Sequence, residues 1–235
     1  MGHKVHPKIH RIQVIYTWDS KWFSKNNYAL HAKQDIFIRE YLEKKCKESL
    51  IEGIRVERGL KNMTVTVFAA KPGFIIGRAG KGLDEIRKYI ETKILKSELK
   101  VTLNIQEVYQ PALAANVVAR TIANDIEKRV PFRRIMKQTI TRVMDAGAQG
   151  VKIKISGRLN GAEIARPETL SAGTVPLITL RSDINYAAVR AETIYGTIGI
   201  KVWICQGQVF GRKDRFEQTG APPKKKSNFK KVNKK

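Results

Sequence analysis

The 235-residue sequence predicts an α+β fold made of two units. Segments with apolar residues at every third or fourth position, typical of amphipathic helices, stand among short runs in which apolar and polar residues alternate as in half-buried strands. Pro111 separates a first group of such segments from a second group. The 42% hydrophobic content supplies enough apolar side chains for real cores, and the length suits one large or two modest domains.

The first unit is predicted to begin with a helix and a hairpin. Apolar residues recur every four positions between residues 34 and 50, which predicts an amphipathic helix. Alternating runs at 54–57 and 64–67 flank a turn-forming segment at 58–62, and this pattern predicts two antiparallel strands. Before them, the polar residues 1–30 are expected to be irregular.

The rest of the first unit contains a glycine-containing loop at 71–82, an amphipathic helix over 83–94 and a third strand at 101–105. The second unit is predicted to hold two helices packed on a mainly antiparallel sheet. The first helix spans 115–126, and the second starts at Pro131, because proline suits a first helical turn. Strands are predicted at residues 151–156, 186–195 and 198–204. The stretch between 157 and 176, punctuated by Gly and Pro, is expected to be irregular.

These elements predict four parts in the chain. An N-terminal extension covers residues 1–37, the first folded unit covers 38–108, and the second covers 109–210. A lysine-rich tail covers 211–235 and is expected to be disordered because it has few apolar residues.

The charge of the chain indicates a polyanionic partner. There are 45 Lys and Arg against 21 Asp and Glu, a formal net charge of +24. The lysines at 221–235 account for only part of this excess, so the folded body is basic as well. Nucleic acid is the expected partner, since neutralising phosphates releases counterions. A membrane surface is the rival, but it favours a basic helix with an aromatic apolar face, and none stands out.

The sequence shows no signs of a membrane or secreted protein. No apolar stretch approaches the roughly 18–20 residues of a membrane span, and the first residues lack the apolar core of a secretion signal. Cys46 and Cys205 lie far apart in the sequence, which argues against a disulfide framework or a cysteine-based zinc site. We therefore expect a soluble protein of a reducing compartment, without a metal or cofactor.

A short glycine loop is the candidate anion-binding site. It consists of Gly77, Arg78, Ala79, Gly80 and Lys81. Glycines at these positions allow positive φ and a close approach of the backbone to a ligand. The helix that follows offers free N–H groups and the positive end of its dipole. A nucleotide-binding P-loop is excluded, because it needs Gly at 75 and Ser or Thr at 82, where the sequence has Ile75 and Gly82.

A tight turn between two helices is the plainer explanation of an isolated pair of glycines. However, Ile75-Ile76-Gly77-Arg78-Ala79-Gly80-Lys81 follows two predicted strands and precedes a helix and a third strand. In this context the segment resembles a KH domain of type II, with the order αββααβ. In KH domains this loop clamps the backbone of about four nucleotides.

A second basic segment lies on the helix predicted after Pro131. Six cations and no acid occur between residues 128 and 142. Arg133, Arg134 and Lys137 share one helical face, opposite the apolar residues. Arginine suits phosphate because its planar fork donates two hydrogen bonds at once. Crowded like charges repel, which favours a compensating polyanion over a merely solvated surface. Further candidate RNA contacts are Lys128, Arg129, Arg142, Lys152, Lys154 and Arg158.

The resemblance extends over about residues 1–210. The sequence is similar to the bacterial or organellar ribosomal protein S-three family of the small subunit. The segments that carry this similarity are Met1–Pro7, Trp18–Phe23, Arg129–Lys137, Ser156–Arg166 and Tyr195–Ile204. The resemblance implies a place in the subunit head, contact with small-subunit ribosomal RNA, and ribosomal proteins S-ten and S-fourteen as neighbours. With S-four and S-five, the family lines the channel by which messenger RNA enters, and its basic helix, here Arg133, Arg134 and Lys137, helps to open messenger RNA structure. The implied location is the ribosome of the cytoplasm, or of an organelle matrix.

Two other classes of function stay open. An RNA-processing enzyme requires a phosphate loop or clustered carboxylates for metal ions, whereas the acidic residues are dispersed and no catalytic motif is found. A free-standing KH regulator would not need the long second unit. We expect no catalytic residues.

Overall fold

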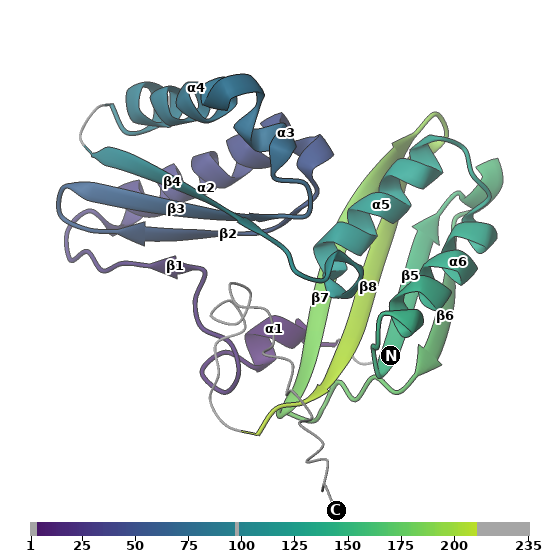
Figure 1. The fold of residues 1–235 in the computed structure, drawn as a ribbon. Coiled ribbons are helices and arrows are strands. Elements are labelled where there is room, and N and C mark those ends of the chain that lie inside the picture. The colour runs from purple at the N-terminus through teal and green to yellow at the C-terminus, as the bar shows by residue number, and fades with distance from the viewer. Residues whose placement is uncertain (1–3, 97–98, 211–235) are drawn as a thin grey trace, which may run out of the picture.

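The computed structural model describes residues 4–96 and 99–210. Figure 1 shows two layered units joined by the segment between β4 and α5, with the N-terminal segment beneath them. We call residues 28–107 the N-terminal unit and residues 111–208 the C-terminal unit. Each unit has helices packed on one face of a four-stranded sheet, and β1 (Ser20–Lys21) of the N-terminal segment supplies the fourth strand of the first sheet. The predicted α+β class is therefore confirmed.

The N-terminal unit has the predicted order of elements. It comprises α2 (Tyr28–Lys45), η1 (Lys47–Ser49), β2 (Ile51–Arg58), β3 (Asn62–Ala69), α3 (Gly73–Ile76), η2 (Arg78–Gly80), α4 (Lys81–Tyr89), η3 (Ile90–Ile94) and β4 (Lys100–Glu107). Strands β2 and β3 form the antiparallel hairpin, and β4 pairs with β3 in parallel. The core lies between the helices and the sheet, where Ile38, Leu42 and Ile90 pack with Val56 and Val65.

Helix α2 begins at Tyr28 rather than near residue 34. Its first turns carry polar residues whose partners lie elsewhere in the fold. The Asp35 carboxylate accepts hydrogen bonds from Arg58 of β2 and from the indole N–H of Trp22, and Gln34 accepts one from Arg58. Because these inward-facing positions hold polar side chains, the four-residue repeat of apolar residues that predicted the helix begins only at Ile38.

The N-terminal extension is more ordered than the sequence predicts. It forms α1 (Pro7–His10) and β1 (Ser20–Lys21). Strand β1 pairs in parallel with β2 at Ser20 and Val56 and so extends the first sheet. The expectation of an irregular segment was wrong here, since a two-residue strand is too short to show alternation and owes its geometry to its partner strand.

The C-terminal unit is an antiparallel sheet covered by two helices. It comprises α5 (Ala115–Glu127), α6 (Phe132–Asp145), β5 (Gly150–Gly157), β6 (Arg166–Gly173), β7 (Ser182–Thr193) and β8 (Gly196–Gln208), with the short turns η4 (Pro111–Leu113) and η5 (Leu159–Gly161). The strand order is β6-β5-β8-β7, and every pair is antiparallel. Its core holds Ile122, Ile135 and Met136 against Ile153 and Val202.

Two details of this unit differ from prediction. Strand β6 lies in the stretch expected to be irregular, and its Pro167 pairs with Ser156 of β5. Proline is tolerated there because β6 is the edge strand and needs no N–H toward solvent. Pro131 does not open the first turn of α6. It has φ −57° and ψ 123° and precedes the helix as its cap residue.

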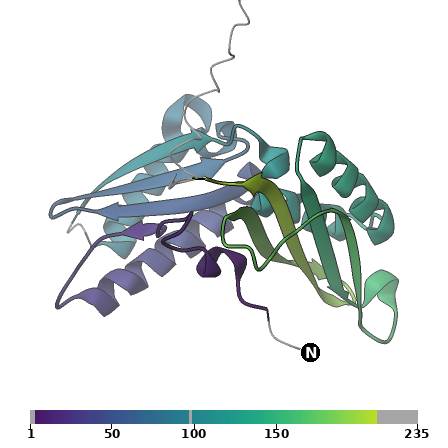
Figure 2. The same cartoon turned by 90° about the horizontal axis from the view of Figure 1, so that it is seen from below.

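The N-terminal segment ties the two units together. The buried Arg11 donates hydrogen bonds to the carbonyl oxygens of Leu177 (2.8 Å) and Thr179 (2.9 Å), which precede β7. Tyr16 donates one to Asp183 of β7. Figure 1 and Figure 2 show α1 beside one edge of the C-terminal sheet, and α1 is in contact with the edge strand β7. The same segment continues into β1 of the first sheet, so it bridges the units.

Candidate nucleic-acid interface

The glycine loop has the backbone geometry that its sequence predicts. It connects α3 to α4 and includes η2. Gly77 has φ 69° and Gly80 has φ 77°, in the region that favours glycine. A third glycine, Gly82, is required for a different reason: a Cβ at this position would lie 2.7 Å from the carbonyl oxygen of Ile75. Sequence reasoning used Gly82 only to exclude a P-loop and missed this close packing of α3 on α4.

The loop offers cations and amide groups but no nucleophile. Arg78 and Lys81 are exposed on either side of the turn. Gly80 precedes α4 and supplies no side chain that accepts a hydrogen bond from the first N–H groups of the helix. The first turn contains one acidic residue, Asp84, whose carboxylate lies 3.9 Å from the Arg87 guanidinium. This arrangement can hold a phosphate by charge and by backbone N–H groups.

Helix α6 has the two faces that its sequence predicts. Ile135, Met136 and Val143 are buried against the C-terminal sheet. Arg133, Arg134 and Lys137 are exposed on the other side. We call these three residues the α6 ridge. Because its backbone is a regular helix packed on a sheet, the ridge holds three cations at fixed spacing on the surface.

One member of the α6 ridge already has an anionic partner. The Arg133 guanidinium donates to both carboxylate oxygens of Glu168 on β6, at 3.1 and 3.3 Å. These hydrogen bonds lower the pKa of Glu168 and raise that of Arg133. Arg166 also lies 3.4 Å from the same carboxylate. Sequence reasoning missed Glu168, since its segment was not recognised as a strand and its place beside α6 comes from sheet pairing.

The remaining predicted contacts do not join the α6 ridge. Lys128 and Arg129 lie in the turn between α5 and α6, and Arg129 has φ 64°. Arg158 donates a hydrogen bond to the carbonyl of Ala162 and lies 5.9 Å from the Tyr195 ring centroid. Arg142 is exposed near the C-terminal end of α6. The structure therefore distributes these cations around the C-terminal unit.

Lys152 and Lys154 lie on the sheet face opposite the helices. They alternate along β5 with the buried Val151, Ile153 and Ile155. Pairing places Lys154 beside Lys201 of β8, and Lys152 beside Trp203, with its ammonium 5.8 Å from the Trp203 ring centroid. Lys201 and Trp203 were not predicted as contacts, although the period-two alternation of β8 places both on this face. A basic and aromatic sheet face suits phosphate and base contacts.

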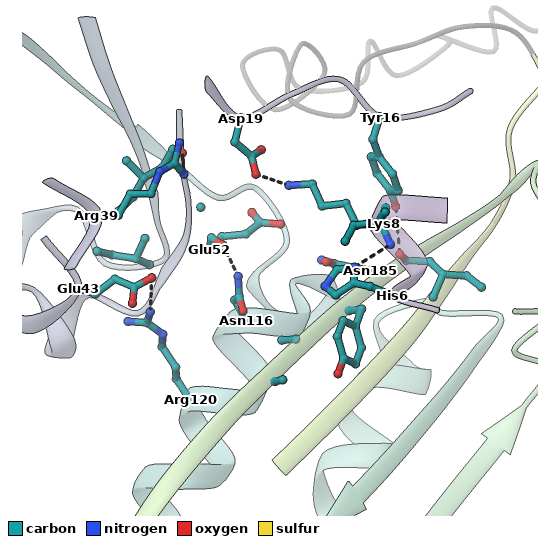
Figure 3. A pocket seen from close by; sticks show the side chains of 18 residues that line it. His6, Lys8, Tyr16, Asp19, Arg39, Glu43, Glu52, Asn116, Arg120 and Asn185 are labelled. Atoms are coloured by element: carbon teal, nitrogen blue, oxygen red, sulfur yellow. Dashed lines mark hydrogen bonds and ion pairs between the residues drawn. The ribbon is translucent and has the colours of Figure 1, made fainter. Parts of the chain in front are cut away.

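A pocket of about 560 Å³ lies where the two units meet the N-terminal segment. Figure 3 shows that its charged side chains point toward one another across the gap. Arg120 of α5 lies 3.4 Å from Glu43 of α2, and Asn116 of α5 donates to the carbonyl oxygen of Glu52 on β2. Phe68 of β3 and Val117 of α5 belong to one apolar cluster between the units. These contacts hold the two units together beside the pocket.

Neither a metal-ligand cluster nor a membrane-spanning helix is found in the part of the chain that the structure describes. Residues 4–96 and 99–210 contain no group of three or more His, Cys, Asp or Glu side chains placed to hold a metal ion. Within these residues, no helix combines the length and apolar character needed to cross a membrane.

Comparison with known proteins matches both units to families. Residues 37–113 match the family model of the KH domain, and residues 122–204 match that of ribosomal protein S3, C-terminal domain. The small ribosomal subunit protein uS3 of Bacillus thuringiensis (strain Al Hakam) is 46% identical over 220 residues, covering 94% of this chain and 99% of the relative. The chain belongs to the uS3 family. The uS3 proteins of Halalkalibacterium halodurans and Desulfitobacterium hafniense are each 45% identical, covering 94% and 91% of this chain and 99% and 96% of the respective relative.

Membership of the uS3 family confirms the resemblance seen in the sequence and settles the class of function. The chain is a bacterial-type uS3 protein with a KH domain, a structural and RNA-binding constituent of the small ribosomal subunit. The uS3 family is not a family of enzymes, so the alternative of an RNA-processing enzyme is wrong.

Proposed function

We propose that this uS3 chain holds incoming messenger RNA with the α6 ridge while its other basic surfaces bind ribosomal RNA. The observation that carries the proposal is the exposure of Arg133, Arg134 and Lys137 on a helix whose opposite side is buried. A cationic row on a rigid element attracts successive phosphates without recognising bases. This is what a protein needs when every messenger sequence must pass it.

The ridge can favour single strands over a duplex by binding energy alone. Each cation that neutralises a phosphate releases counterions, and Arg134 can donate two hydrogen bonds to one phosphate. A strand held by these contacts is less free to pair again. The resemblance stated above supports a position at the channel through which messenger RNA enters, beside ribosomal proteins S-four and S-five. It also supports S-ten and S-fourteen as neighbours in the subunit head, within cytoplasmic ribosomes.

The KH loop and the outer sheet face belong to the same proposal. Gly77, Arg78, Ala79, Gly80 and Lys81 hold an RNA backbone, while Lys152 and Lys154 contact ribosomal RNA together with Lys201. We also propose the division of the chain into an extension at 1–37, a KH domain at 38–108, a second domain at 109–210 and a tail at 211–235. The tail lies outside the described residues.

The test is translation through a stable hairpin by ribosomes carrying Arg133→Ala, Arg134→Ala and Lys137→Ala. The matched control replaces three exposed lysines outside the α6 ridge by alanine, so that both variants lose three positive charges. These lysines are Lys47, Lys88 and Lys100. We expect the ridge variant to slow on the hairpin messenger and to translate an unstructured messenger normally. Equal progress of the two variants through the hairpin would refute the messenger RNA role and leave ribosomal RNA binding intact.

A further inference from the structure

A groove runs across the helical face of the N-terminal unit, between α2 on one side and α4 with η3 on the other. It has a volume of about 550 Å³ and includes none of the residues of the KH loop or the α6 ridge. We propose that this groove binds a protein segment that is acidic and carries apolar side chains. The proposal goes beyond RNA binding, because it assigns a protein-binding surface to the KH domain.

The floor of the groove is apolar and exposed. Leu30, Phe37 and Tyr89 are 50%, 47% and 41% exposed, respectively. Tyr41 and Ile94 also line the groove and pack against the buried core beneath it. The groove is therefore a rigid apolar surface, since its floor is continuous with the core. Contiguous exposed apolar side chains of this kind mark binding surfaces.

The rim of the groove is cationic. Among the described residues that line it there are four lysines and a single acid: Lys33, Lys44, Lys93, Lys96 and Glu40. All four lysines are exposed. An occupant with apolar side chains toward the floor and carboxylates toward the rim complements both features. Complementary charge also steers such a partner to the groove and disfavours basic ones.

The aliphatic part of the floor favours a protein over RNA, because nucleic acid offers few apolar groups to bury against Leu30 and Ile94. A base that stacks on a protein needs a free ring face, and each aromatic ring of this floor has one face covered. Tyr41 and Tyr89 stack on each other, with ring centroids 4.0 Å apart and planes 10° apart. The Lys33 ammonium lies 5.8 Å from the centroid of Phe37 and covers one of its faces. The described lining contains no arginine, the residue best suited to forked binding of phosphate.

Photocrosslinking in purified small subunits tests the proposal. The photoreactive amino acid p-benzoylphenylalanine replaces Phe37 in the full chain, which tolerates the change because this side chain is about half exposed. The control places the same group at Leu60, at the exposed turn between β2 and β3. We expect the Phe37 position to give an adduct with one protein segment, which mass spectrometry identifies as acidic with apolar residues. An adduct with ribosomal RNA, an adduct with a basic segment, or no adduct above the Leu60 control would overturn the proposal.

A charge-reversal pair sharpens the test. Lys33→Glu with Lys93→Glu should lower the adduct yield by about tenfold, because like charges then face each other across the contact. Lys25→Glu with Lys47→Glu changes the net charge equally at exposed positions outside the groove and should leave the yield unchanged. Equal yields from the two variants would contradict the proposal. Sedimentation with small subunits shows separately that each variant is incorporated. The messenger RNA role is tested by the α6 ridge variant on the hairpin messenger, so failure of that role leaves the adduct at Phe37 unchanged and the two failures can be told apart.

Discussion

Arg133 of α6 and Glu168 of β6 form a two-pronged ion pair, with Nη2 3.1 Å from Oε1 and Nε 3.3 Å from Oε2. The pair joins the helix to the edge strand of the sheet. It also neutralises part of the positive charge of the α6 ridge. In the proposed function Glu168 therefore limits how much of that charge RNA can use, whereas Arg134 and Lys137 form no ion pair with β6 among the described residues.

Replacing Glu168 by glutamine should strengthen RNA binding by the ridge. Without the carboxylate, Arg133 becomes free to neutralise a phosphate. We expect the slope of log K against log salt concentration to become steeper by about 0.7 for a single-stranded RNA. Filter binding over a series of salt concentrations measures this slope. Glu163→Gln, at an exposed position on the loop before β6, is the control and should change the slope much less.

The same pair predicts a pH dependence of stability. The hydrogen bonds from Arg133 hold the pKa of Glu168 below its ordinary value of 4.5. The folded state therefore binds this proton less readily than the unfolded state, and the pair stabilises the fold above pH of about 4.5. As the pH falls through the lowered pKa, that contribution is lost. Urea unfolding of the wild type and Glu168→Gln should converge on acidification; a difference that grows instead would contradict the assignment.

Asp35→Ala should cause a large loss of stability. The Arg58–Asp35 ion pair is buried, with side chains only 4% and 6% exposed, and Trp22 donates to the same carboxylate. Removing the carboxylate leaves a buried guanidinium without its counter-charge, which costs about 3–5 kcal/mol. Urea unfolding of the full chain measures the change in free energy. Asp84→Ala removes an exposed carboxylate and should cost less than about 1 kcal/mol; similar losses in both variants would be inconsistent with our interpretation.

Gly77→Asp with Gly80→Asp should weaken RNA binding by the KH loop. The change adds two negative charges where phosphate is expected, at positions with positive φ. Losing one charged hydrogen bond to phosphate already corresponds to about tenfold in affinity. Gly147→Asp with Gly196→Asp is a matched control, because both glycines have positive φ and open space around them. If the two double variants bind a single-stranded oligoribonucleotide equally, the loop is only a turn.

Much of the fold could be predicted because its strongest elements carry their own pattern. Helices α5 and α6 and strands β5 and β8 bury one regular face, so their apolar residues repeat with the period of the structure. The glycine loop was predictable for a similar reason, since Gly77 and Gly80 have the local conformation that glycine favours.

The parts that escaped prediction depend on distant partners. Strand β6 is an edge strand with a proline, and β1 is two residues long, so neither shows a local signal. The partner of Arg133 was missed for the same reason, because sheet pairing brings Glu168 beside α6. The groove on the KH domain needed the packing of α2 against α4 and η3, which no single segment of sequence encodes.

The contacts of Arg11 have a consequence for how the protein is made. Its guanidinium reaches the carbonyl oxygens of Pro176, Leu177 and Thr179, which lie 165 to 168 positions later in the chain. During translation these contacts cannot form until residues 176–179 have left the synthesising ribosome. The link between the N-terminal segment and the C-terminal unit therefore forms only after the KH domain has been synthesised.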